Sequence, residues 1–460
     1  MKKISNLLIL ALLTIGMGLT SCDEQLDNAV TPVVAEVTSI TVDLPKIDEK
    51  YLDTEKTKLQ LTVGDEVTLS FTILPEEMAS TEVELTAADA TILSIDGLKV
   101  KALKEGETKV TAKAGDKTAE CTVTVKAAEV AVTGVKLDKA VLRIDKYNTI
   151  ETLTATVSPA EATDKTVTWK SSDENVATVD ASGKITPIKA GTVTIQATAG
   201  DKTATSTVYV YDEINTFFSG LDQSINVPTG KSYMFTSYGG TPSNTKIIIE
   251  DGATVTLNGI NFTNQIECKG TATIILADGS TNTVTASGGK AGIKIGGNGT
   301  TLTINAETLG TGILNATGGS QAAGIGTNKN DTGGNIVING GRVTATGGDY
   351  AAGIGTGYAS GSANECGTIT INGGTVTATG GMGAAGIGTG LANGSSSPNE
   401  CGDITIGTGV TSVTATMGAA SSYSIGKGLG ANQTCGTITI GGTVYAGGVT
   451  ISPFTYTPSN

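Results

Sequence analysis

The sequence has no histidine and few aromatic residues. Histidine is the commonest general base and the commonest zinc ligand, so its absence removes the simplest route to acid–base catalysis and to a zinc site. Aromatic residues make up 4% of the chain and include one tryptophan, which leaves few rings to stack against a substrate. These shortages argue against an enzyme.

Basic residues are scarce relative to acidic ones. The chain has 30 lysines and arginines against 44 aspartates and glutamates, which gives a net charge of −14 at pH 7. A protein that binds nucleic acid needs a basic surface to neutralise phosphates. We therefore expect no nucleic-acid partner.

The first residues have the layout of a cleaved export signal. Two lysines precede an apolar run from Leu7 to Leu19, which is too short to span a bilayer comfortably. The run ends in Leu19-Thr20-Ser21-Cys22, which resembles the bacterial lipobox. That resemblance implies cleavage before Cys22 and attachment of diacylglycerol to its sulfur, so residues 1–21 are predicted to be a lipoprotein signal peptide.

A short acidic tether follows, over residues 22–36. Asp23, Glu24 and Asp27 resemble the surface-export signal of Bacteroidota lipoproteins, although enterobacterial rules read Asp23 as retention at the inner membrane. Stable anchoring needs two or more acyl chains, which an acylated Cys22 supplies. We expect an outer-membrane lipoprotein that is exposed at the cell surface and held to the membrane by its lipid.

Two segments read as short alternating strands separated by polar turns, which is typical of antiparallel β-sandwiches. We predict Ig-like domains over residues 37–127 and 128–211. The second contains Val167-Thr168-Trp169-Lys170-Ser171-Ser172-Asp173 and Ala190-Gly191-Thr192-Val193-Thr194-Ile195, and it resembles the bacterial Ig-like group 2 family of surface adhesins such as intimin and invasin relatives. The first is a divergent match without the tryptophan. Alternation places Trp169 in the core, and both domains are expected to act as spacers.

After Tyr211 the composition shifts to glycine, threonine, alanine and isoleucine, and a repeat of about 34 residues begins. One isoleucine recurs at steps of 34, 33, 35 and 34, at Ile304, Ile338, Ile371, Ile406 and Ile440. Each repeat offers three short β segments with glycine-rich corners, which is one coil of a parallel β-helix. The predicted fold class is all-β, with two Ig-like sandwiches and then a Gly/Thr-rich parallel β-helix with an N-terminal cap over residues 212–460.

The second strand of each coil supplies a candidate ligand face. We align its inward pairs as Val284/Ala286, Leu314/Ala316, Val343/Ala345, Val376/Ala378, Val413/Ala415 and Val444/Ala446. The outward neighbours then form two polar columns whose central members are Thr344, Thr346, Thr377, Thr379, Thr414 and Thr416. The alternative is β-propensity on a solvated sheet. The array is similar to the Thr-x-Thr face of ice-binding proteins, but Ser287, Asn315 and Tyr445 interrupt it.

Loops before the first strand of each coil carry acidic residues at equivalent positions. Asp331, Glu365 and Glu400 are candidates for a shared calcium site. The alternative is solvated loop acids, because no Asp-x-Asp-x-Asp spacing is present.

Six cysteines leave an odd number once Cys22 is assigned to lipid, so a full disulfide framework is excluded. Cys366, Cys401 and Cys435 share one position in successive coils. They are expected to be a ladder of small buried residues, or to include one disulfide that leaves the third thiol free.

Several polysaccharide lyases and hydrolases use β-helices with paired carboxylates. Asp349 and Arg342 lie near one strand end, without a second carboxylate at strand spacing. This region resembles the glycine-rich β-helical repeats of carbohydrate-binding bacterial surface proteins. We therefore predict a non-catalytic surface lipoprotein whose β-helix binds glycans or host polymers, with a purely structural role or a degenerate polysaccharide-degrading β-helix as alternatives.

Overall fold

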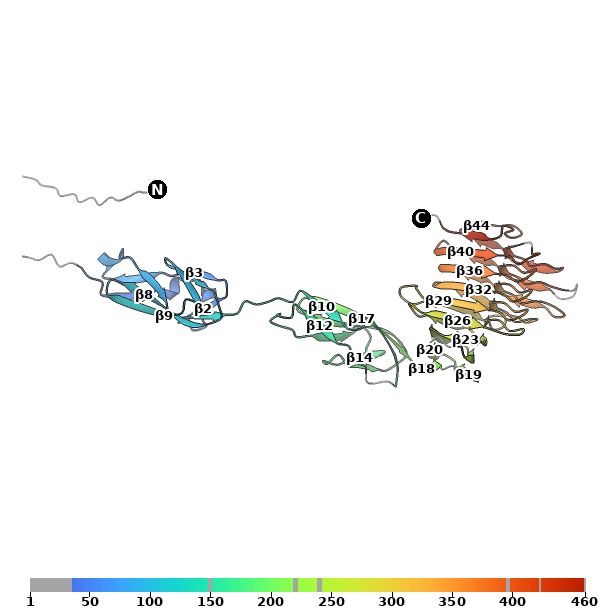
Figure 1. Ribbon diagram of the computed structural model, residues 1–460, viewed down its shortest axis with the longest axis horizontal. Coiled ribbons are helices and arrows are strands. Elements are labelled where there is room, and N and C mark those ends of the chain that lie inside the picture. Colours follow the sequence, from blue (N-terminus) through green and yellow to red (C-terminus); the bar gives the residue numbers. More distant parts are fainter. Residues whose placement is uncertain are drawn as a thin grey trace, which may run out of the picture. The chain divides into compact units, whose positions relative to one another are not determined.

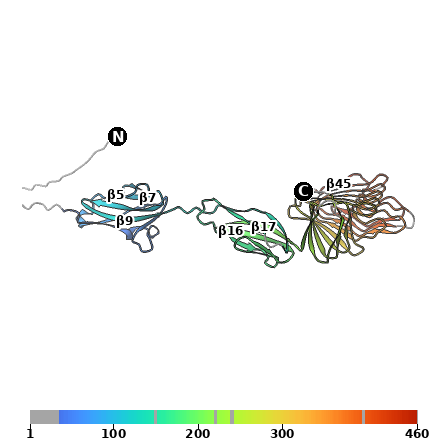
Figure 2. The ribbon, with the colours of Figure 1, turned by 60° about the horizontal axis from the view of Figure 1, so that its bottom comes forward.

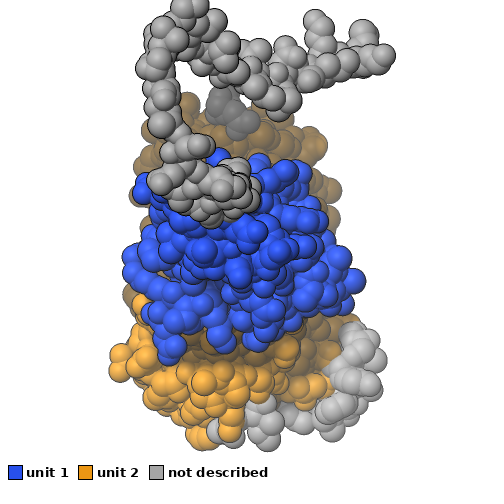
Figure 3. Space-filling model, turned by 90° about the vertical axis from the view of Figure 1, so that its left-hand side faces the viewer, with its two compact units in different colours: residues 1–129 blue, residues 130–460 orange. Residues whose placement is uncertain are grey.

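The structure is a computed structural model that describes residues 35–147, 151–217, 222–237, 242–393, 398–421 and 423–458. The chain divides into two compact units, residues 1–129 and 130–460 (Figure 3). The described residues form β-strands and the short 3-10 helices η1 (Leu44–Lys46), η2 (Glu49–Tyr51) and η3 (Glu76–Met78), which confirms the all-β prediction. None of the helices in this part of the chain is long and apolar enough to cross a membrane. The predicted signal peptide and Cys22 lie outside the described residues.

The first unit is an Ig-like sandwich around one core of aliphatic side chains that includes Leu59, Leu93 and Val123. Alternation along each strand sends every second residue into this core. Cys121 is buried there. The sheets are β2 (Leu59–Thr62), β9 (Lys117–Lys126), β8 (Gly106–Ala114) and β5 (Glu84–Ala87); β3 (Glu66–Thr68), β7 (Lys99–Ala102) and β6 (Leu93–Asp96); and the pair β1 (Ser39–Val42) and β4 (Phe71–Leu74).

The second unit begins with another Ig-like sandwich. Trp169 packs half-buried against its core, as predicted. Gly183 lies beneath the indole with φ +82, and a Cβ there would be 2.8 Å from the ring atom Cζ2. The strands are β11 (Val141–Asp145), β17 (Lys202–Tyr211), β16 (Gly191–Ala199) and β13 (Thr168–Ser171) in one sheet, with the pairs β10 (Gly134–Leu137) and β12 (Ala155–Ser158), and β14 (Ala177–Val179) and β15 (Ile185–Pro187).

The rest of the second unit is a parallel β-helix, whose stacked coils are visible in Figure 1. Its sheet A is formed by the Ile-Thr-Ile segments of successive coils. In spatial order sheet A contains β18 (Glu213–Phe217), β20 (Ser232–Ser237), β22 (Ala253–Asn258), β25 (Ala272–Leu276), β28 (Thr301–Ala306), β31 (Asn335–Ile338), β35 (Ile369–Ile371), β39 (Ile404–Ile406), β43 (Ile438–Ile440) and β44 (Thr443–Val444).

Sheets B and C complete the coils. Sheet B, from the Gly-Ile-Gly segments, contains β19 (Asp222–Val227), β21 (Asn244–Ile249), β24 (Ile266–Cys268), β27 (Ile293–Lys294), β30 (Ile325–Gly326), β33 (Ile354–Gly355), β37 (Ile387–Gly388) and β41 (Ile425–Gly426). Sheet C, from the Val-Thr-Ala-Thr segments, contains β23 (Asn261–Phe262), β26 (Thr281–Thr285), β29 (Ile313–Thr317), β32 (Arg342–Thr346), β36 (Gly374–Thr379), β40 (Val410–Thr416) and β45 (Phe454–Tyr456).

A fourth short strand, which the three-strand repeat did not predict, is present in three coils. It forms sheet D from β34 (Asn364–Cys366), β38 (Asn399–Cys401) and β42 (Gln433–Cys435). Its inward asparagines are buried and hydrogen-bonded within the coil stack: the Asn399 amide donates to the carbonyl of Gly390 at 3.1 Å, and Asn364 accepts from Thr327 at 2.6 Å. These hydrogen bonds hold the long corner in place, although the Asn399 side-chain oxygen is buried without a partner among the described residues.

The predicted inward and outward alternation is confirmed in the central coils. Ile369, Ile371, Val376 and Ala378 are all fully buried. Equivalent residues stack in register from coil to coil, so Ile338, Ile371 and Ile406 of sheet A form one column. The core is therefore a set of columns, and some of them, such as this one, repeat a single residue type.

The two ends of the β-helix differ in structure. At the N-terminal end, regular coils begin at β18, and the rings of Phe217 and Phe262 meet edge to face with centroids 5.2 Å apart. At the C-terminal end, β45 pairs antiparallel with β40 and so covers the end of sheet C (Figure 2).

Candidate functional site

The outer face of sheet C carries the predicted threonines in two straight columns. Backbone pairing aligns Thr344 with Thr377 and Thr414, and it aligns Thr346 with Thr379 and Thr416. Thr344 is exposed and the other five are half-buried, because each side chain stands between the neighbours above and below it. The structure therefore brings all six predicted residues together on one face.

The expected register of the first of these coils was wrong by two residues. Asn282, not Val284, is the partner of Leu314, and Val284 pairs with Ala316. Asn282 is fully buried, and hydrogen bonds of its side chain make this possible. The side-chain oxygen accepts from the backbone amides of Gly259 and Ile260 at 2.8 and 3.1 Å, and the side-chain nitrogen donates to the Ile313 carbonyl at 3.0 Å. A satisfied asparagine thus occupies a position that residue type alone assigned to valine.

This correction lengthens the threonine face. Thr285 now stacks on Thr317, which stacks on Thr346, so Ser287 no longer interrupts that column. The complete column is Thr285, Thr317, Thr346, Thr379 and Thr416. The other column begins at Thr283 and keeps one interruption, at Asn315.

The prediction for the last coil of the threonine face, at Val444 and Tyr445, was also wrong. Val444 ends a hairpin with β43, and Tyr445 packs against Phe454, with ring centroids 6.4 Å apart, in the C-terminal cap. Thr455 of β45 takes the place expected for Tyr445, and its hydroxyl lies 3.3 Å from that of Thr414. The chain turns back at this point, so sheet C ends with the antiparallel strand β45, and Val444 and Tyr445 do not form a further parallel strand.

A second threonine column, on the outer face of sheet A, provides an internal comparison. Thr303, Thr370 and Thr405 are half-buried there, and Val337 interrupts them. The sheet A column extends from Thr254 to Thr439 and is interrupted once, at Val337. Sheet C offers two threonine columns side by side, one of which is interrupted, at Asn315. The coil spacing of about 4.8 Å sets one repeat of the sheet C lattice and the two-residue strand spacing of about 6.6 Å sets the other.

An aromatic pair flanks the sheet B strand β33, with Tyr350 before the strand and Tyr358 after it. The rings of Tyr350 and Tyr358 have centroids 5.4 Å apart, and Lys329 lies over the Tyr358 ring at 5.7 Å. Tyr350 adopts φ 67, a left-handed conformation that costs a non-glycine residue about 1–2 kcal/mol. Both residues are half-buried, so part of each ring is open to solvent.

The three acidic candidates are neighbours, but one of them already has a cation. Asp331 lies 3.1 Å from Lys294, which also contacts Glu267 at 3.3 Å. Glu365 pairs in register with Glu400, and its carboxylate accepts a hydrogen bond from Asn298 at 3.4 Å. No group of three acidic, cysteine or histidine side chains in the described part of the chain is arranged to hold a metal. The geometry gives the calcium expectation no support.

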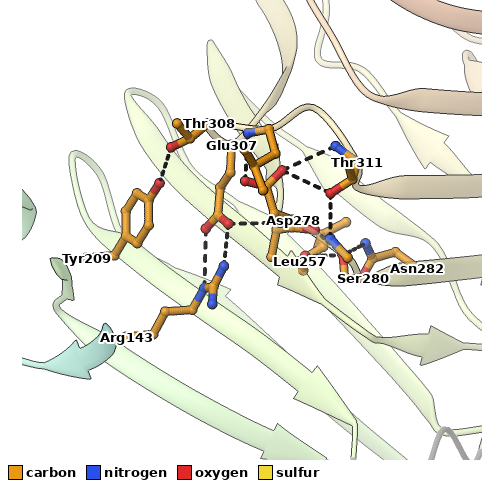
Figure 4. Close-up of polar contacts among 12 residues, drawn as sticks. Arg143, Tyr209, Leu257, Asp278, Ser280, Asn282, Glu307, Thr308 and Thr311 are labelled. Carbon is orange, nitrogen blue, oxygen red and sulfur yellow. Dashed lines mark hydrogen bonds and ion pairs between the residues drawn. The ribbon is translucent and has the colours of Figure 1, made fainter. Parts of the chain in front are cut away.

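Sequence reasoning missed the contact between the second Ig-like sandwich and the β-helix. The Arg143 guanidinium binds both carboxylate oxygens of Glu307, with Nε 3.3 Å from Oε1 (Figure 4). The Glu307 side chain is 2% exposed, and it also accepts from the backbone amide of Asp278 at 2.8 Å. Beside this pair, the Tyr209 and Thr308 hydroxyls are 2.9 Å apart (Figure 4).

A second ion pair lies where the chain leaves the sandwich. Lys146 is 3.0 Å from Asp212, which also accepts from the Ser232 amide at 2.9 Å. Burial opposes the ionisation of Asp212, but Ser232 and Lys146 outweigh it and lower its pKa. Burial raises the pKa of the adjacent Tyr211 to about 12. No spacing in the sequence marks these partners, because they lie far apart along the chain.

Comparison with known proteins supports both kinds of fold. Residues 131–210 match the bacterial Ig-like domain (group 2). Residues 336–358 and 369–391 match the β-helix repeat. The predicted kinship of the second Ig-like domain is thus confirmed, as is the repeat.

Several known proteins are similar to limited segments of this chain. An Ig-like virion protein of Serratia phage KSP90 is 37% identical over 148 residues, which is 30% of this chain and 56% of that protein. An alpha-L-arabinofuranosidase of Bifidobacterium longum is 56% identical over 66 residues, 14% of this chain and 6% of the enzyme. An S-layer-related protein of Niallia circulans is 37% identical over 98 residues, 21% of this chain and 6% of that protein. The chain therefore spans at most 56% of these three relatives.

Proposed function

We propose that this chain is a lipid-anchored, non-catalytic cell-surface protein whose β-helix binds glycans on the outer face of sheet C. The Ig-like domains act as spacers between the anchor at Cys22 and the β-helix. The observation that carries the proposal is the pair of threonine columns aligned in register through β32, β36 and β40.

The chemistry of this face suits a polyhydroxylated polymer. Each threonine hydroxyl is one donor and carries two acceptor lone pairs, so it can exchange hydrogen bonds with sugar hydroxyls in either direction. The columns present these groups on a rigid sheet, so little side-chain entropy is lost when a ligand binds. The Tyr350 and Tyr358 rings provide an amphipathic surface on which the apolar face of a sugar ring can pack.

The surface location has support from two sources. First, the second Ig-like domain matches the bacterial Ig-like group 2 family, and its sequence resembles that of surface adhesins. Second, two of the proteins that are similar to part of this chain are named as a virion protein and an S-layer-related protein. The arabinofuranosidase match covers 6% of that enzyme, so it supports a shared accessory segment and gives no ground for transferring the activity.

One observation favours a second candidate function, glycoside hydrolysis. Glu365 and Glu400 pair in register on adjacent strands, about 4.8 Å apart at the backbone, and the carboxyl groups of retaining glycosidases are about 5–5.5 Å apart. Glu365 already accepts a hydrogen bond from Asn298, which weighs against a role as nucleophile. New reducing ends that appear with wild type and vanish in Glu365→Gln would establish this alternative.

The proposal is tested by applying the chain from residue 23 onward to a broad glycan array, with and without calcium. We expect saturable binding to a restricted set of glycans, equal in both conditions. A variant with Thr344→Val, Thr377→Val and Thr414→Val removes three hydroxyls and keeps shape and β-propensity, so its signal should fall at least tenfold. Absence of binding by the wild type would leave the structural role as the better account.

A further inference from the structure

Three cysteines form a ladder inside the β-helix. Cys366 pairs in register with Cys401 on the adjacent strand of sheet D, and Cys401 pairs in the same way with Cys435. All three side chains face the core, because the outward position on each strand is taken by Glu365, Glu400 or Thr434. The thiols are therefore stacked one coil apart, at about 4.8 Å.

The ladder begins at Cys366 for a steric reason. The preceding coil has Gly333 at this place, where a Cβ would lie 2.7 Å from the side chain of Ile295. Cys366 and Cys401 are each 5% exposed, whereas Cys435, on the last strand of sheet D, is more accessible. A reagent in solution can therefore reach the ladder only at Cys435.

The spacing rules out one metal ion bound to all three sulfurs. The outer two cysteines are two coils apart, about 9.6 Å, whereas sulfurs that share a zinc ion at about 2.3 Å each cannot be more than about 4.6 Å apart. A disulfide needs only two neighbours. Its usual Cα separation of about 4.4–6.8 Å includes the spacing of one coil.

We propose that Cys401 and Cys435 are a thiol pair that external disulfides oxidise, with Cys435 as the attacking group and Cys366 left as a thiol. The Cys435 thiolate attacks a small disulfide, forms a mixed disulfide and releases one thiolate of the reagent. Cys401 then loses its proton to solvent and attacks the Cys435 sulfur, which releases the second thiolate. Two protein thiols are oxidised, and one external disulfide is reduced to two thiols.

The surroundings of Cys435 support its role as the first nucleophile. The hydrogen bond with Cys401 lowers the pKa of Cys435 despite its burial, and the positive charge of Lys427 lowers that pKa further. Hydrogen bonds with both neighbours raise the pKa of Cys401 well above its ordinary value. A thiolate is the reactive form, so attack begins at the accessible end of the ladder.

The test exposes the chain from residue 23 onward to oxidised glutathione, blocks the remaining thiols after denaturation, and maps the peptides by mass spectrometry. The structure contains five free cysteines, so five minus two gives three blocked thiols, at Cys121, Cys268 and Cys366. We also expect one cross-linked peptide that joins Cys401 to Cys435.

Three serine variants separate the steps. Cys401→Ser should accumulate glutathione on Cys435, because no resolving thiol remains. Cys435→Ser should leave every thiol unmodified, since the others are buried. Cys366→Ser is the matched control and should cross-link as the wild type does. Far-UV circular dichroism checks that each variant folds, and the wild-type peptide map decides the pairing if one does not.

Two results would overturn the proposal. One is a cross-link between Cys366 and Cys401 in the wild type. The other is five blocked thiols after an exposure that oxidises a small dithiol completely.

Discussion

The two kinds of domain in this chain bury apolar residues in different ways. Each Ig-like sandwich closes one core from strands that meet face to face, so every core residue has a different environment. The β-helix repeats one environment from coil to coil, and Ile338, Ile371 and Ile406 share a single column. Its backbone segments also stack directly on one another, so glycines such as Gly355 are required by the close approach of backbone to backbone, whereas Gly97 of the first sandwich has open space around its Cβ position.

Breaking the contact between the second sandwich and the β-helix should cause the largest loss of stability. Arg143→Ala leaves the Glu307 carboxylate buried without a cation, which typically costs about 3–5 kcal/mol. The matched control is Lys101→Ala, because Lys101 and Glu66 are 2.8 Å apart and about half exposed, and such pairs contribute at most about 1 kcal/mol. Denaturant unfolding of both variants measures the difference. Equal effects would show that the Arg143 contact does not stabilise the second unit.

Replacing a glycine in the β-helix stack should cause the next largest loss of stability, and a larger one than replacing a turn glycine of a sandwich. Gly355 has φ +132, and a Cβ there would lie 1.9 Å from the carbonyl oxygen of Gly388 in the next coil. Gly355→Ala should therefore destabilise the β-helix by about 3 kcal/mol or more. In the first sandwich, Gly97 has φ +58 with open space around its Cβ position, so Gly97→Ala should cost about 1 kcal/mol from backbone strain alone. Thermal unfolding of the two variants compares them, and a larger loss for Gly97→Ala would refute this view of the stack.

The smallest expected effect is the pH-dependent stability that Asp212 contributes. The pKa of Asp212 is lowered in the folded protein, so its ionised form contributes stability above the unfolded value of about 3.9, and that contribution is lost as pH falls through the folded pKa. Asp212→Asn should reduce stability at pH 7 by about 1 kcal/mol, with the gap to wild type closing below about pH 4. Urea unfolding across this range measures the gap. A gap that stays constant with pH would exclude the ion pair with Lys146 as its cause.

The β-helix could be predicted because its sequence repeats, and the errors in the predicted register occurred where the repeat is broken. Regular positions such as Ile371 and Val376 followed from alternation because each coil imposes the same pattern. Asn282 broke the residue-type pattern while keeping the geometry, so the first coil was placed two residues out of register. Hydrogen bonds to Gly259 and Ile260 make that substitution tolerable, and no local sequence signal shows them.

Long-range polar contacts were beyond reach for a related reason. Glu307 looked like one loop acid among many, and its partner Arg143 is 164 residues away in the sequence. The fourth strand, present in three coils, did leave a signal, since Asn364-Glu365-Cys366 recurs as Asn399-Glu400-Cys401. That recurrence pointed to shared structure, but only the pairing in sheet D shows that asparagine and cysteine face inward and glutamate faces outward.

The central claim is that the outer face of sheet C is the ligand surface, and sheet A offers its control. An oligosaccharide selected on the array would be titrated calorimetrically against three proteins: the wild type, the Thr344, Thr377 and Thr414 valine variant, and a Thr303, Thr370 and Thr405 valine variant on sheet A. The account predicts that Kd rises at least tenfold for the sheet C variant and stays within about twofold for the sheet A variant, because net hydrogen bonds of about 0.5–1.5 kcal/mol each are lost only on sheet C. Equal affinity in all three proteins would contradict it.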